Sequence, residues 1–133
     1  IQSQYTNFDV GNVGIGTTSP TEKLEVNGNI KSNGLVTAIS TKSANYTVTA
    51  NDNTLIAETA GITFTLPDAS TARVGREYNF VNYTNGSITV TTTSGTGQFV
   101  WDNATLTTPS SSFFSNLTFG FKAYNGKWYL VHK

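Results

Sequence analysis

Residues 78–92 read Tyr78-Asn-Phe-Val-Asn-Tyr83, then Thr-Asn85-Gly86-Ser, then Ile88-Thr-Val-Thr-Thr92. In both outer segments apolar and polar side chains alternate, as they do in a strand that buries one face. An Asn-Gly dipeptide between two such segments is typical of a type I′ turn. We therefore expect the two segments to pair as an antiparallel hairpin.

The same alternation recurs in both directions along the chain. The further strand segments are Tyr46-Thr-Val-Thr-Ala50, Leu55-Ile56, Ile62-Thr-Phe-Thr-Leu66, Phe99-Val-Trp101, Leu117-Thr-Phe-Gly-Phe121 and Trp128-Tyr-Leu-Val131. A second Asn-Gly dipeptide, Asn125-Gly126, separates the last two and predicts another hairpin. No segment has a helical period, and the one candidate helical turn begins at Asp68, whose side chain can cap it.

Strands at this spacing predict an all-β fold. For residues 43–133 we expect an antiparallel β-sandwich or jelly-roll-like domain. Four phenylalanines on alternating positions are expected in its core: Phe64, Phe80, Phe119 and Phe121. Disorder is not expected, because charged residues make up only 12% of the chain and aromatic residues another 12%.

Composition excludes several classes of function. The 133 residues contain no cysteine and one histidine, His132, so a disulfide framework, a zinc–thiolate site and a histidine cluster are excluded. Eight basic and eight acidic residues balance, which argues against a nucleic-acid or anionic-membrane surface. No apolar run approaches the ~20 residues of a membrane span. The chain begins at Ile1 without a basic, apolar leader, so we expect a mature or excised fragment.

Residues 1–42 carry few large side chains. Val13-Gly-Ile15 and Leu24-Glu-Val26 have the period of short strands, with a turn at Gly16-Thr-Thr-Ser-Pro20 between them. Two or three such strands cannot bury a hydrophobic face alone. We therefore expect this segment to form a β-structured shaft that packs on copies of itself, followed by the domain of residues 43–133.

Two stretches of residues 1–42 resemble a module of phage tail fibres and tailspikes: Asn12-Val-Gly-Ile-Gly-Thr-Thr-Ser-Pro20 and Lys23-Leu-Glu-Val-Asn-Gly28. The module also occurs in large surface proteins of Bacteroidetes-like bacteria. In that family it forms intertwined β-structure in a homotrimeric shaft. Residues 44–133 look like a β-domain found near the C-termini of tail fibres, and residues 121–130 are similar to its final hairpin.

The resemblance implies the distal part of a homotrimeric tail fibre, located on the virion and extracellular. Its β-tip would attach to a host cell-surface glycan or protein. Two other readings stay open. One is a bacterial surface or adhesin module used for binding or as a spacer. The other is a polysaccharide-degrading tailspike domain, which would need a pair of carboxylates in a groove.

We expect no catalytic site, no cofactor and no metal site. Gly14-x-Gly16 lacks the third glycine and the helix of a dinucleotide loop, so it is interpreted as a turn. The carboxylates are scattered, and nothing in the sequence brings Asp68, Glu77 and Asp102 together. Asn51-Asp52-Asn53 offers one charged ligand, too few for Ca²⁺, and is also interpreted as a turn.

Aromatic side chains at strand ends are the candidate ligand-binding residues. Trp101 stands beside Asp102-Asn103, and Tyr83 stands beside Asn85. An aromatic ring can stack on the apolar face of a sugar while amide and carboxylate groups bind its hydroxyls. Tyr124 and Trp128, which flank the last hairpin, are further candidates.

Overall fold

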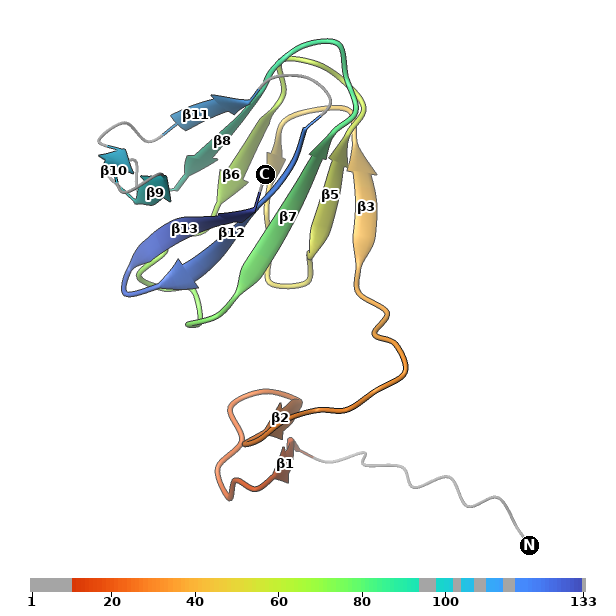
Figure 1. Cartoon of the computed structure of the whole chain (residues 1–133), viewed down its shortest axis with the longest axis vertical. Helices are drawn as coiled ribbons and strands as arrows, with labels where there is room; N and C mark the ends of the chain where they lie inside the picture. Colours follow the sequence, from red (N-terminus) through yellow and green to blue (C-terminus); the bar gives the residue numbers. More distant parts are fainter. Residues whose placement is uncertain (1–10, 94–97, 102–103, 107–109, 114–116, 133) are drawn as a thin grey trace, which may run out of the picture. The chain divides into compact units, whose positions relative to one another are not determined.

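The computed structural model describes residues 11–93, 98–101, 104–106, 110–113 and 117–132. The chain divides into two compact units, Ile1–Val36 and Thr37–Lys133. Every regular element among the described residues is a β-strand, so the chain is all-β as expected (Figure 1).

The first unit holds one parallel strand pair, β1 (Val13–Ile15) with β2 (Leu24–Val26). Both strands coincide with the segments expected from the sequence. The chain between them makes one coil, closed by backbone hydrogen bonds from Val13 N to Lys23 O (2.8 Å) and from Asn27 N to Ile15 O (2.9 Å). Gly16 has a positive φ of 74° at this coil, which is why a glycine stands there.

The second unit contains two sheets that share one hydrophobic core. The larger sheet has the order β10 (Ala104–Leu106), β9 (Phe99–Trp101), β13 (Lys127–His132), β12 (Leu117–Tyr124), β7 (Glu77–Asn82), β5 (Thr54–Ala57) and β3 (Ile39–Lys42). The smaller sheet has the order β11 (Ser110–Phe113), β8 (Ile88–Thr92), β6 (Thr63–Leu66) and β4 (Tyr46–Thr47).

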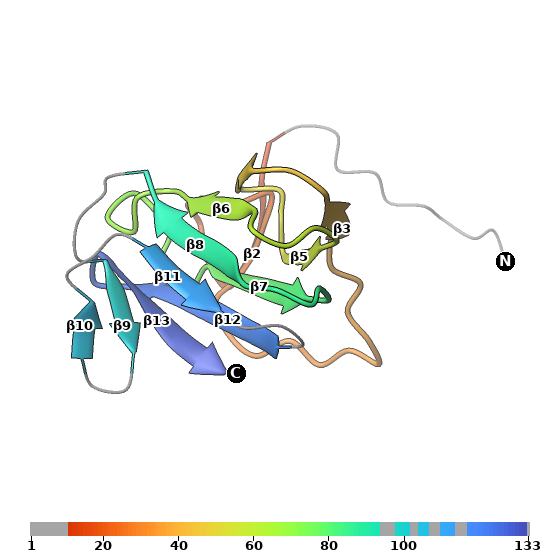
Figure 2. The same cartoon turned by 90° about the horizontal axis from the view of Figure 1, so that it is seen from above.

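From β3 to β8 the chain alternates between the two sheets. β3, β5 and β7 are parallel in the larger sheet, and β4, β6 and β8 are parallel in the smaller one (Figures 1 and 2). The expected antiparallel arrangement is therefore wrong for the pairs among these six strands, whereas β7 with β12 and β8 with β11 are antiparallel as expected. Each corner carries the chain across to the other sheet, so the chain returns to a sheet after two corners and runs in its former direction.

Only one of the two Asn-Gly dipeptides forms the hairpin turn expected for it. Asn125-Gly126 joins the antiparallel strands β12 and β13, and both residues have the positive φ that a type I′ turn requires, 48° and 70°. The hairpin predicted at Asn85-Gly86 is wrong, because β7 and β8 lie in different sheets. Neither Asn85 nor Gly86, both described, has a positive φ.

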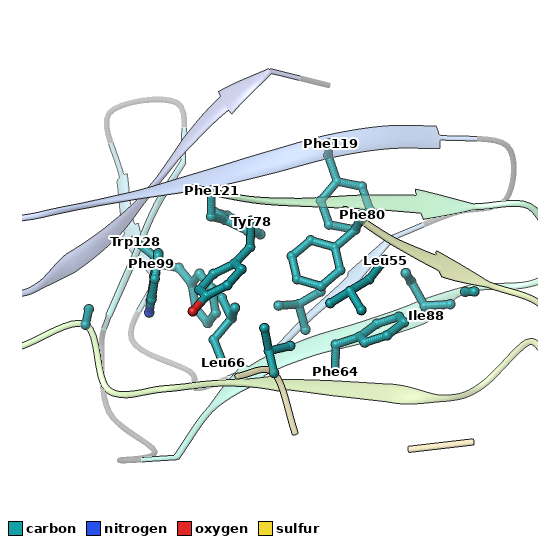
Figure 3. Packing of buried hydrophobic residues seen from close by; sticks show 14 of the residues in the cluster. Leu55, Phe64, Leu66, Tyr78, Phe80, Ile88, Phe99, Phe119, Phe121 and Trp128 are labelled. Carbon is teal, nitrogen blue, oxygen red and sulfur yellow. The ribbon is translucent and has the colours of Figure 1, made fainter. Parts of the chain in front are cut away.

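Alternate residues of β5, β6, β7 and β8 are buried, so each strand turns one face to the core. The four phenylalanines expected there are fully buried, which confirms the core prediction (Figure 3). Phe64 of the smaller sheet lies 5.2 Å from Phe80 of the larger sheet, measured between ring centroids. Such contacts add about 0.5–1.5 kcal/mol to the free energy of area burial.

The first unit ends at Val36, although the sequence placed the boundary after Lys42. β3 belongs to the second unit because it pairs with β5, where Thr54 N donates to Ala38 O (3.0 Å). The helical turn expected at Asp68 is present as a single hydrogen-bonded turn, in which Ala72 N donates to Asp68 O (3.1 Å).

Candidate functional site

The corner of residues 82–87, here called the Asn82 corner, carries the chain from β7 to β8. Strand alternation points Asn82 into the core, where it is only 1% exposed. Its side chain is satisfied locally: Nδ2 donates to Gly86 O (2.8 Å), and Oδ1 accepts from Thr84 Oγ1 (2.7 Å) and Thr84 N (3.2 Å). Because buried polar groups cost free energy unless they are paired, this network holds the corner in one conformation.

The alternation continues through the corner and turns two candidate residues outward. Thr84 is buried like Asn82, whereas Tyr83 and Asn85 are exposed. Tyr83 is 81% exposed, an unusual position for a large aromatic ring. The corner therefore exposes the phenol ring of Tyr83 and the amide of Asn85 on a backbone that the buried Asn82 and Thr84 side chains hold in place.

A neighbouring corner, residues 58–61, lies against the Asn82 corner. Gly61 N donates to Ser87 O (2.8 Å). A Cβ on Gly86 would lie 2.8 Å from the Cβ of Ala60, so only glycine fits at this contact. The two corners thus form one continuous surface.

Parallel register adds a carboxylate that sequence reasoning missed. Ala57 of β5 is paired with Asn82 of β7, so the next residues, Glu58 and Tyr83, are level at adjacent strand ends. Both side chains are exposed. The surface thereby combines an aromatic ring with amide and carboxylate groups, a combination suited to sugar hydroxyls and to the apolar face of a sugar ring. No sequence signal links Glu58 to Tyr83, because only the pairing of β5 with β7 brings them together.

Of the other candidates, Asp102 and Asn103 lie outside the described residues, and only the backbone of Trp101 is described, at the end of β9. Three interstrand steps separate β9 from β7 in the larger sheet, about 14 Å in all. The residue pairs across these strands place Trp101 level with Tyr78. That is about 17 Å along the strand from Tyr83. Trp101 and Tyr83 therefore do not share one site within a chain.

The last hairpin separates the two further candidates. Trp128 is fully buried, its Nε1 donates to Pro67 O (3.1 Å), and its ring lies 5.4 Å from that of Tyr78 (Figure 3). The prediction that Trp128 faces a ligand is therefore wrong, because its side chain lies on the inward face of β13. Tyr124 is exposed and stands edge-to-face against Tyr129, with 6.1 Å between ring centroids.

Two of the three carboxylates considered for catalysis, Asp68 and Glu77, have structural partners, and the third, Asp102, lies outside the described residues. Asp68 Oδ1 accepts from Ser70 N (2.8 Å) and Gln98 Nε2 (2.9 Å), and Glu77 pairs with Lys122 (3.2 Å). Asp52 Oδ2 accepts from Tyr46 and Thr49, in the turn expected for residues 51–53.

Within the described part of the chain, no three His, Cys, Asp or Glu side chains gather as metal ligands would. The described residues also include no helix with the length and apolar character needed to cross a membrane.

Comparisons with protein-family models, curated proteins and solved structures find no match to this chain.

Proposed function

We propose that this chain is the distal part of a homotrimeric phage tail fibre, whose β-sandwich tip attaches the virion to glycan on the host cell surface. One observation carries the proposal. Between residues 11 and 42 not one side chain is fully buried, although this stretch contains large apolar residues. Ile15, Leu24, Ile30, Leu35 and Val36 are all more than half exposed.

Such a segment is stabilised by association with its own copies. Full burial of a Leu or Ile side chain contributes roughly 1.5–3 kcal/mol, and three symmetry-related copies can cover one another's apolar side chains around a common axis. The resemblance of residues 12–28 to the shaft module of tail fibres favours three copies. The second unit has its own core and serves as the tip.

Sedimentation of the full chain tests this association. We expect a species of three times the 14.3 kDa chain mass at micromolar concentration. Leu24→Asp, which puts a charge on an exposed apolar position of β2, should shift the chain toward monomer. Glu22→Asp, an exposed conservative change in the same unit, is the control. A wild-type chain that sediments as a stable 14.3 kDa monomer would refute the proposal.

The glycan-binding surface we assign to the tip is the Asn82 corner with Glu58. Tyr83→Ala should reduce binding to a glycan array and to host cells by tenfold or more, about 1.4 kcal/mol of lost stacking and burial. Val74→Ala is the control, because Val74 is also an exposed apolar side chain but precedes β7 and is not among the candidate ligand-binding residues. Equal effects of the two substitutions would exclude the corner as the binding surface. A trimer that binds no glycan and no cell would favour the spacer of a bacterial surface protein.

A further inference from the structure

β3 is an edge strand of the larger sheet, with β5 as its neighbour. Two backbone hydrogen bonds show which residues face β5: Thr54 N donates to Ala38 O (3.0 Å), and Glu58 N donates to Lys42 O (2.9 Å). Successive residues of a strand direct their N–H and C=O groups to opposite sides. Ile39 and Thr41 therefore direct their backbone donors and acceptors away from β5, along the free edge.

This edge carries little that would repel another strand. Natural sheet edges are commonly protected by charges, prolines or bulges. β3 has the sequence Ile39-Ser-Thr-Lys42, and its one charged side chain turns aside, with Nζ 3.7 Å from the centre of the Tyr46 ring. Ile39 is 66% exposed beside the free backbone groups.

The segment before β3 is the linker of residues 29–36, which contains no regular secondary structure and has a bend at Asn33. Within the described chain its backbone groups make no hydrogen bond. Leu35 is 83% exposed and Val36 is 100% exposed. The linker thus has the same two properties as the edge of β3, unpaired backbone and exposed apolar side chains.

Leu35 and Val36 cannot pair with the β3 of their own chain. Ala38 is already held to β5, which leaves Thr37 between Val36 and the paired strand. A hairpin needs a loop of at least two residues, with Asn or Gly at the positions of positive φ. Neither Thr37 nor Ala38, both within the described range, has a positive φ.

We propose that residues 30–36 of a second copy of this chain add as a strand to the free edge of β3. The inference rests on the self-association of the proposed function and names the surface that the association uses inside the tip domain. Every copy both donates a linker and offers an edge. A closed ring of copies then pairs every β3 edge, and of the adjacent Leu35 and Val36 it buries beside Ile39 of the neighbouring chain the one that lies on the same face of the sheet.

Residue-resolved amide hydrogen exchange on the full chain tests this pairing without any substitution. In the assembled protein we expect the amides of Ile39 and Thr41, and alternate amides of residues 30–36 including one of Leu35 and Val36, to exchange at least a hundredfold more slowly than after dilution to monomer. The amide of Ser40, which faces β5, is the internal control and should be slow in both states.

The outcomes separate the two proposals. A wild-type chain that remains monomeric overturns the proposed function together with this inference. An assembly in which Ile39 and Thr41 exchange rapidly overturns the inference alone. Protection of these two amides without protection of any amide of residues 30–36 places another strand on the edge and overturns the linker as the occupant.

Proline at Thr41 provides a second test, because proline removes an N–H that β5 does not use. Thr41→Pro should raise the dissociation constant of the assembly at least tenfold, whereas Thr41→Ala, which keeps the N–H, should leave it within threefold. The near-ultraviolet circular dichroism of the buried Trp128 reports whether the tip stays folded. Unchanged assembly of a folded Thr41→Pro chain overturns the inference. Should this variant not fold, the exchange experiment decides.

Discussion

Asn82→Ala tests whether buried hydrogen bonds fix the Asn82 corner. The substitution removes the donor to Gly86 O and the acceptor of Thr84 N and Thr84 Oγ1, at a residue that is 1% exposed. Each neutral hydrogen bond contributes roughly 0.5–1.5 kcal/mol, and a buried group left without a partner costs about 1–3 kcal/mol. We expect the free energy of unfolding to fall by about 2–4 kcal/mol in total.

The assay is urea unfolding at one fixed protein concentration, because self-association makes apparent stability depend on concentration. The transition midpoint should fall while its slope against urea stays constant. Asn85→Ala is the matched control, since Asn85 belongs to the same corner but is exposed, and it should change stability by less than about 0.5 kcal/mol. If the two variants lose equal stability, the network does not fix the corner.

Three further substitutions address other contacts. Gly86→Ala should lower the free energy of unfolding in urea by about 1–3 kcal/mol, because its Cβ would lie 2.8 Å from that of Ala60. Adding Ala60→Gly should restore most of this stability, and failure of the rescue would place the strain elsewhere. Trp128→Phe should cost about 2–4 kcal/mol by the same assay, since it loses core volume and the hydrogen bond to Pro67 O, and a loss below about 0.5 kcal/mol would contradict its burial. Trp101→Ala tests a second contact, separate from the Asn82 corner, at the end of β9: it should weaken adsorption to host cells while sedimentation shows intact assembly, and unchanged adsorption would exclude this second contact.

The candidate site shows which side chains the local sequence pattern predicts correctly and which it does not. A position at a strand end beside a turn dipeptide predicts that Tyr83 and Asn85 are exposed, and both side chains are. The same pattern predicts exposure of Trp128, which is buried. Proximity to a turn does not decide which face of a strand meets the core, since adjacent residues point to opposite faces. Glu58 was missed because its nearness to Tyr83 depends on the register of β5 with β7.

Alternation with period two is a local property of the backbone, so the sequence predicts where most strands lie, that the chain is all-β and that Phe64, Phe80, Phe119 and Phe121 lie in the core. It does not single out Phe99, which is buried with them. It also determined the hairpin at Asn125-Gly126, where the positive φ values belong to the dipeptide itself. Tertiary structure decided which strands pair, and in which direction. At Asn85-Gly86 the same dipeptide joins two sheets, because the buried side chain of Asn82 engages Gly86 and Thr84. Burial and long-range register depend on the whole packed domain, and there they outweigh the turn preference of two residues.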